Sequence, residues 1–167
     1  MASIPTSLSS PTTSVTKKVG ITKVVPTPSL SFSEEVEQEI HILVNAARAQ
    51  NGLVPLVWDS ALTVLAREHS VDMQTHTYFA HDNLLGCSSS CRVTSAGYAW
   101  VSLGENIYTM SGFTVSSKEA AEMVVIGWLK SPGHRANILS TTYTNQGVGV
   151  ATEGKTLYAT EDFAKPR

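Results

Sequence analysis

Two β-type runs near the C-terminus constrain the fold of this chain more than any other feature. Residues 146–152 and 156–163 are rich in β-branched and aromatic residues, and they flank Glu153-Gly154-Lys155. Two such runs around a short loop with glycine are typical of a β-hairpin. The segments before them show the helical spacing of apolar residues instead. Helices followed by a terminal hairpin predict an α+β domain in which helices cover a sheet.

Three longer segments carry helical patterns with recognisable start and stop signals. The first begins at Ser31, where Glu34 three residues later completes a capping box, and it ends at Asn51-Gly52. The other expected features are the N-caps Asp59 and Ser116, a helix end at Pro132-Gly133, a short strand over residues 105–110, and short helical turns at residues 91–95 and 134–139.

Length and composition indicate one folded domain and exclude two kinds of partner. Residues 1–30 are rich in Ser, Thr, Pro and Val without a regular period, so we expect a flexible tail before a domain at residues 31–167. The net charge of −2 and the lack of a basic stripe argue against nucleic acid. No apolar run is long enough for a membrane span, and no signal peptide is recognisable at the N-terminus. We expect a monomer.

Two cysteines, Cys87 and Cys91, lie four residues apart. On a helical turn their α-carbons would be about 6 Å apart, which is within the range of a disulfide. One interpretation is a disulfide that closes a small extracellular loop, and the other is two free thiols. The pair alone does not predict a structural zinc site, because such a site needs four ligands.

Five segments follow one another in an informative order. They are Asn45-Ala46-Ala47-Arg48, Tyr78-Phe79-Ala80-His81, Gly104-Glu105-Asn106-Ile107, the run from Trp128 to Leu139, and Gly147-Val148-Gly149-Val150. Together they resemble the CAP superfamily of cysteine-rich secretory, antigen 5 and pathogenesis-related proteins, also called the SCP domain. The resemblance is strongest to the simple bacterial members. It implies a three-layer α–β–α sandwich, with the hairpin in the central sheet, and an extracellular or cell-surface location.

The resemblance also implies that His81, Glu105 and His134 meet in a central cleft. Many eukaryotic members have a second acid three residues after a tryptophan, but here Ser131 follows Trp128 at that spacing. The expected site is therefore a triad. Two imidazoles and one carboxylate can hold Zn²⁺ with a position left for water, and His81 and His134 are then the expected metal ligands. The alternative interpretation is a hydrogen-bonded polar cluster without metal.

Several further residues have two interpretations each. Ser131 can end a helix before Pro132, or it can act as a nucleophile with His134, oriented by Glu105. No Gly-x-Ser-x-Gly elbow is present, which favours the helix end. Asn45, Arg48 and Asn106 are expected to support the structure, and an acid elsewhere in the chain is a candidate ion-pair partner of Arg48. The aromatic residues Tyr98 and Trp100 belong either to the core or to the mouth of the cleft, and His69 is expected in the core.

Three functions fit these observations. We favour a non-enzymatic secreted binding domain whose partner is a small hydrophobic ligand or an extracellular protein. The first alternative is a metal-dependent hydrolase or peptidase, with Glu105 or Ser131 as the candidate catalytic residue. The second is a protein that binds or exports sterols or fatty acids through an apolar groove, to which Val115, Val124 and Tyr143 would contribute.

Overall fold

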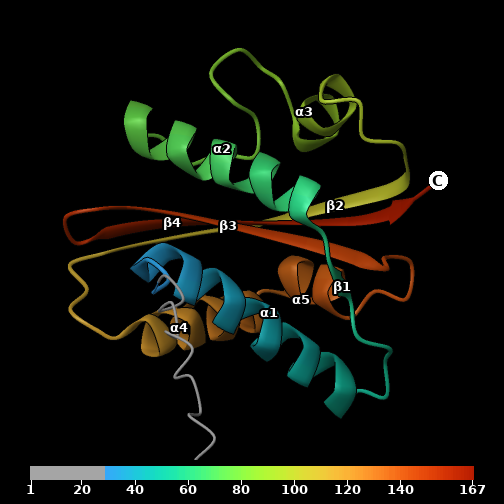
Figure 1. Cartoon of the computed structure of the whole chain (residues 1–167), viewed down its shortest axis with the longest axis horizontal. Coiled ribbons are helices and arrows are strands. Elements are labelled where there is room, and N and C mark those ends of the chain that lie inside the picture. The colour runs from blue at the N-terminus through green and yellow to red at the C-terminus, as the bar shows by residue number, and fades with distance from the viewer. Residues whose placement is uncertain (1–28) are drawn as a thin grey trace, which may run out of the picture.

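The described part of the chain has three layers, with a sheet between two layers of helices (Figure 1). A computed structural model describes residues 29–167, so residues 1–28 of the expected tail lie outside the described part. The helices are α1 (Phe32–Gln50), α2 (Ser60–His76), α3 (Ser89–Ser95), α4 (Ser117–Lys130) and α5 (Pro132–Ile138). The strands are β1 (Val57–Trp58), β2 (Trp100–Ser111), β3 (Asn145–Glu153) and β4 (Thr156–Pro166).

The sheet has the strand order β1-β3-β4-β2. Strands β3 and β4 form the expected hairpin, β2 pairs antiparallel with β4, and β1 pairs parallel with β3. In the β2–β4 register Glu105 lies opposite Asp162, and Asn106 lies opposite Glu161. Because successive side chains of a strand point to opposite faces, these two pairs lie on opposite sides of the sheet.

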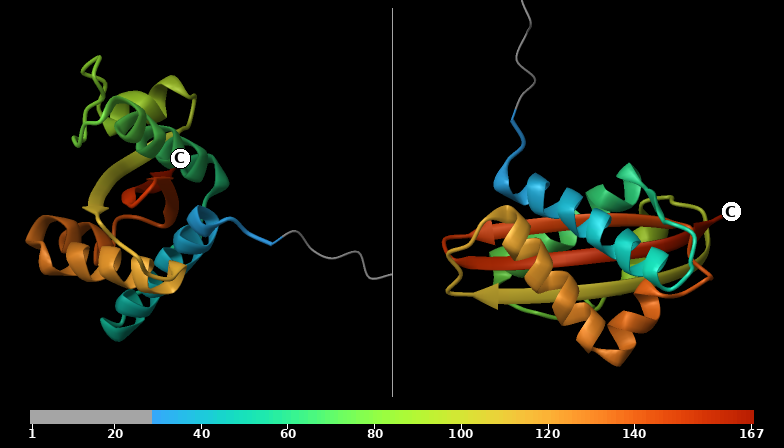
Figure 2. Two further views of the ribbon diagram at one scale, coloured as in Figure 1. Left: turned by 90° about the vertical axis from the view of Figure 1, so that its left-hand side faces the viewer. Right: turned by 90° about the horizontal axis from the view of Figure 1, so that it is seen from below.

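Helices cover both faces of the sheet, and their local signals place their ends. Figure 1 shows α2 and α3 above the sheet, and Figure 2 shows α1 and α4 lying across the other face. Both expected capping boxes are present, at Ser31 and at Ser116, because each serine side chain accepts from the backbone N–H of a glutamate that bonds back. No helix in residues 29–167 is long and apolar enough to cross a membrane.

Two strands differ from the sequence-based expectation. Strand β1 was not expected, since two residues are too few to show a period; it forms because the Val57 N–H donates to the Thr144 carbonyl at 2.9 Å. Strand β2 is also longer than the predicted residues 105–110. It extends back to Trp100, because its pairing with β4 continues past the glycine at position 104.

The main core lies between the sheet and the layer of α1 and α4, around the fully buried Trp128 and Phe163. On the other face, α2 packs directly on β3 at two glycines. A Cβ atom at Gly147 would lie 2.3 Å from the backbone of Leu62, and one at Gly149 would lie 2.0 Å from the backbone nitrogen of Arg67. Only glycine allows this close approach of helix and strand.

Candidate functional site

A cavity of about 540 Å³ at the outer edge of β2 contains both expected histidines. We call it the histidine cleft. One wall is the segment after α2, residues 79–81, and the opposite wall is formed by Gly127, Ser131 and His134 of α4 and α5. Residues 107–109 of β2 form the floor between the two walls. The cleft therefore spans the edge of the sheet and draws on both helical layers.

The carboxylate of Glu105 orients His81 from below the cleft. The Nδ1 atom of His81 lies 2.7 Å from Oε1 of Glu105, so Nδ1–H donates to the carboxylate, and in the neutral ring Nε2 carries the lone pair. The Arg92 guanidinium of α3 binds the other carboxylate oxygen, and it also donates to the backbone carbonyl of His81 at 2.8 Å. The Glu105 side chain is only 4% exposed, whereas that of His81 is 53% exposed. The imidazole is thus accessible but held from two sides.

The hydrogen bond that His81 donates to Glu105 favours the charged form of His81 and raises its pKa above the ordinary value of 6.5. Next to Glu105 on the sheet, the buried Asp162 accepts a hydrogen bond from Ser89 at 3.2 Å. Burial and the charge of Glu105 raise the pKa of Asp162 to about 8. The neutral form of Asp162 is therefore favoured, and Arg92 and His81 face the carboxylate of Glu105.

The histidine of the opposite wall, His134, is placed through its backbone. Helix α5 starts with Pro132 at its first turn, and the buried Asn106 donates to the His134 carbonyl at 3.2 Å. Asn137 of the same helix donates to the side chain of Asn106 at 2.9 Å and to the carbonyl of Glu105 at 3.2 Å. Burial, and then the proximity of His81, lower the pKa of His134 below 6.5. His134 is consequently neutral at neutral pH.

The expected triad is present in one region, but its internal pairing differs from two of the expectations. Glu105 binds His81 and not His134, so the Ser131–His134–Glu105 arrangement of a nucleophilic site is not formed. Ser131 lines the cleft and joins α4 to α5, and its hydroxyl caps neither helix. Within residues 29–167 no three His, Cys, Asp or Glu side chains converge as metal ligands.

A buried polar chain lies behind the cleft, on the face of the sheet that α1 covers. Glu161 of β4 is fully buried, and it accepts from Asn106 at 3.0 Å and from the side chain of Gln146. The side-chain oxygen Oε1 of Gln146 accepts from Nδ1 of His41 in α1. The other ring nitrogen of His41 accepts from the side-chain amide of Asn45 at 3.2 Å. His41 therefore links α1 to the buried Gln146 side chain of β3.

Burial raises the pKa of Glu161 to about 8. The hydrogen bonds from Asn106 and Gln146 and the charge of Arg48 act in the opposite direction, and Asp162 on the next position adds to the increase. The desolvation of the carboxylate is the largest of these effects, so the neutral form of Glu161 is favoured.

Asn45 and Arg48, two of the residues expected to support the structure, bond to backbone groups of other segments. Asn45 joins α1 to the following loop, since it donates to the Leu56 carbonyl and accepts from the Leu56 N–H. Arg48 donates to the carbonyls of Val54, Ile138 and Ser140 at 2.7–3.0 Å. Its hydrogen-bond partners are thus backbone carbonyls of the loop after α1, of the end of α5 and of the loop after α5, and none is an acid.

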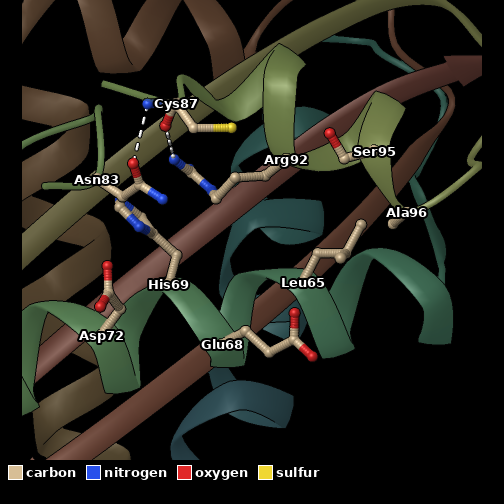
Figure 3. A pocket seen from close by; sticks show the side chains of 9 residues that line it. All are labelled: Leu65, Glu68, His69, Asp72, Asn83, Cys87, Arg92, Ser95 and Ala96. Atoms are coloured by element: carbon tan, nitrogen blue, oxygen red, sulfur yellow. Dashed lines mark hydrogen bonds between the residues drawn. The ribbon is translucent and has the colours of Figure 1, made fainter. Parts of the chain in front are cut away.

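A second cavity, of about 430 Å³, lies between α2 and α3 (Figure 3). The sulfurs of Cys87 and Cys91 form a disulfide here, with their Cα atoms 5.3 Å apart. Buried His69 lines this cavity and lies 3.0 Å from the Ala80 carbonyl through Nε2, which ties the segment of His81 to α2. His69 is therefore a core residue, and its burial lowers its pKa.

Sequence reasoning missed Arg92, Glu161 and Asp162 as parts of the site. Consecutive acids inside a β-run were the available signal for Glu161 and Asp162, because acids are rare in buried strands. Arg92 had no such signal. Tyr98 and Trp100 do not line the histidine cleft: Tyr98 donates to Asp59 at 2.6 Å and Trp100 to Thr94 at 3.1 Å.

Comparison with known proteins places this site in a family context. The sequence model of the cysteine-rich secretory protein family, CAP, matches residues 41–163. The uncharacterised Bacillus subtilis protein YkwD is 36% identical over 118 residues, which are 71% of this chain and 43% of YkwD. The structure of an extracellular Bacillus anthracis protein containing an SCP domain is 32% identical with a TM-score of 0.64, over 80% of this chain and 41% of that protein.

A third comparison concerns the fold alone. An outer surface protein from Borrelia burgdorferi is 19% identical, with a TM-score of 0.70 over 83% of this chain and 97% of that protein. By contrast, the chain spans less than half of the lengths of YkwD and of the Bacillus anthracis protein.

Proposed function

Because this chain belongs to the cysteine-rich secretory protein family, CAP, we propose that it is an extracellular binding domain whose histidine cleft holds a divalent metal ion, Zn²⁺ in the first place. The observation that carries the proposal is the hydrogen bond between His81 and Glu105. The extracellular location is supported by the Bacillus anthracis relative, which is described as an extracellular protein.

Two imidazoles in the cleft offer nitrogen donors to a zinc ion, whose other positions would be left to water or a ligand, since no third His, Cys, Asp or Glu joins them within residues 29–167. The Nδ1–H of His81 donates a hydrogen bond to a carboxylate, and this arrangement orients a metal-binding histidine and strengthens its bond to the metal. His134, whose pKa is lowered, offers a neutral ring in the same cavity. Such a metal ion would act as a Lewis acid with its other positions open to water or a ligand. His81 and His134 would bind it, and Glu105 and Arg92 would hold His81 in place.

The contacts of Glu105 favour binding over hydrolysis. A hydrolase of this type needs a carboxylate or a hydroxyl that is free to accept a proton from the attacking group. In the cleft, one oxygen of Glu105 faces His81 and the other faces Arg92. The hydroxyl of Ser131 has no imidazole partner in the described residues. We therefore propose a role in binding, and a turnover assay with Glu105→Gln is the direct test of the hydrolase alternative.

Isothermal titration calorimetry of the chelator-stripped full chain with ZnCl₂ tests the metal site. We expect one site of micromolar or tighter affinity, lost in the double variant His81→Ala, His134→Ala. Glu105→Gln removes the charge behind His81 and should weaken zinc binding by about 10- to 100-fold. The matched control is His76→Ala, because His76 is an exposed histidine that pairs with Asp72 outside the cleft. Zinc binding that survives the double substitution would contradict the proposal.

A second candidate function rests on an apolar groove between α1 and α4. The groove has a volume of about 290 Å³ and is lined mainly by Leu43, Ala46, Ala47, Val125, Ile126 and Leu129. It is suited to the acyl chain of a fatty acid. Val124, which the sequence suggested for such a groove, is instead fully buried in the core, whereas Tyr143 lines a separate cavity of about 490 Å³ together with Leu53, Val54 and Pro55.

Substitution at the groove separates this function from the metal site. Ala46→Phe fills the groove and should abolish binding of a fluorescent fatty acid while zinc binding is retained. Ala49→Phe, at an exposed position of α1 outside the groove, is the control and should leave fatty-acid binding intact. Equal fatty-acid binding by both variants would refute the assignment of the acyl chain to this groove.

A further inference from the structure

Strand β2 is an edge strand, and its outer edge forms the floor of the histidine cleft. The direction of its backbone groups follows from the pairing with β4. The N–H of Gly112 donates to the carbonyl of Lys155, which continues the β2–β4 register by one position. The backbone groups of even-numbered residues in β2 therefore point toward β4, and those of odd-numbered residues point toward the open edge.

Side chains from other elements satisfy the first part of this edge. The carbonyl of Leu103 accepts from the Tyr143 hydroxyl, that of Glu105 from Asn137, and that of Ile107 from the indole of Trp128, at 3.0–3.2 Å. All three carbonyls belong to odd-numbered residues, which confirms the alternation. Because these three carbonyl oxygens already accept a hydrogen bond, they are not free to pair with an added strand.

The next odd-numbered residue, Thr109, lacks such a cap. Thr109 lies on the floor of the cleft beside His81 and His134. The Thr109 hydroxyl donates to the backbone carbonyl of Leu157 at 3.0 Å, but no group in residues 29–167 bonds to the outward N–H or C=O of Thr109. A backbone donor and acceptor are thus presented together inside the cavity. Their spacing is the one that an added β-strand uses.

We propose that the cleft binds an extended peptide segment of another protein, paired to the backbone of Thr109 as an additional strand, with a carboxylate of that peptide beside His81 and His134. The proposal rests on the proposed function in taking the histidine cleft as a binding site, and it names the class of partner.

The charge and shape of the cleft select this partner. Within residues 29–167 no carboxylate lines the cavity to repel an anionic ligand, and a ligand carboxylate can accept from an imidazole N–H of the cleft or bind a metal ion that both rings hold. Phe79, which is 48% exposed, and the ring of Tyr108 offer apolar contacts to a peptide side chain on each side of the edge. A peptide that ends in a carboxylate satisfies both features.

The peptide Ac-Val-Thr-Val-Thr-Glu with a free C-terminus is a suitable probe, because pairing through the backbone depends little on sequence. Titration into the ¹⁵N-labelled full chain should shift the amide resonance of Thr109. An extended peptide uses only one of its edges. Two analogues, each N-methylated on one set of alternate residues, should therefore differ: one should bind at least tenfold more weakly, and the other should bind as the parent does.

Variants at the edge complete the test. Thr109→Pro removes the outward N–H and no hydrogen bond to β4 from the backbone, and it should weaken peptide binding at least tenfold. Thr109→Val lacks the hydroxyl, as proline does, but keeps the N–H and should bind normally. If Thr109→Pro does not fold, Ser111→Pro removes the next outward N–H near the exposed strand end. No shift of the Thr109 amide with the parent peptide, or equal binding of both methylated analogues, would overturn the proposal. If the chain binds the peptide but fails to bind zinc, only the metal site is refuted. If it binds zinc but fails to bind the peptide, only the pairing of a peptide to the edge of β2 is refuted.

Discussion

The close packing of α2 on β3 makes Gly149→Ala a sharp test of the fold. The added Cβ atom would lie 2.0 Å from the backbone nitrogen of Arg67 and 2.2 Å from the backbone carbon of Ala66. Ordinary van der Waals contacts of such atoms are 3.4–4 Å. Both neighbours are backbone atoms of a helix and cannot rotate away. The whole of α2 must therefore withdraw from the sheet by roughly 1 Å or more.

The cost of this movement follows from the contacts that it breaks. Leu62, Ala66 and Met73 of α2 are fully buried against the sheet, so a displaced helix loses packing along its length. Overpacking of this kind destabilises a protein by about 3 kcal/mol. For a chain of this size, that loss lowers the melting temperature by roughly 6–12 °C.

Urea unfolding followed by circular dichroism measures the effect. The matched control is Gly133→Ala, because Gly133 lies in α5 and a Cβ atom there meets nothing within 4 Å. Alanine at that helical position should be neutral or stabilise the protein by up to about 1 kcal/mol. A Gly149→Ala protein within about 1 kcal/mol of the Gly133→Ala protein would refute the reasoning.

Two further predictions concern stability, and one concerns the cleft. Because the pKa of Glu161 is raised from 4.5 to about 8, its contribution to the free energy of unfolding is complete below pH 4.5 and is lost as the pH rises through 8. Between pH 5 and 8 the free energy of unfolding of the unsubstituted protein should therefore fall by up to about 4 kcal/mol relative to that of Glu161→Gln, as measured by urea titration. Replacing Cys87 and Cys91 by serine opens a small loop and should cost about 2 kcal/mol, measured in the same way; no loss would contradict the disulfide as a stabilising element. His69→Phe releases the Ala80 carbonyl and should weaken zinc binding several-fold in calorimetry, whereas unchanged affinity would show that this bond does not position His81.

The sequence carries the helices well because their signals are local. Ser31 with Glu34 and Ser116 with Glu119 each form a reciprocal pair within one turn, so four residues suffice to place a helix start. Strand β1 has no comparable signal. Its two residues become a strand only because β3, from a distant part of the chain, lies beside them.

The site is predictable in its members and not in its pairing. The family motifs place His81, Glu105 and His134 in one region, and the cavity contains both histidines. They do not indicate which histidine receives the carboxylate. That choice depends on Arg92, which reaches Glu105 from α3. The position of α3 is fixed by tertiary packing, so no local pattern could have revealed the contact.

The register between β2 and β4 explains why adjacent residues of the Gly-Glu-Asn segment have separate tasks. Glu105 points to the face of α2 and α3, where it meets Asp162 and holds His81. Asn106 points to the opposite face, where it meets Glu161 and holds the backbone of His134. One strand thus orients both walls of the cleft from its two sides. A shift of one residue in this register would exchange the two faces and separate both histidines from their supports.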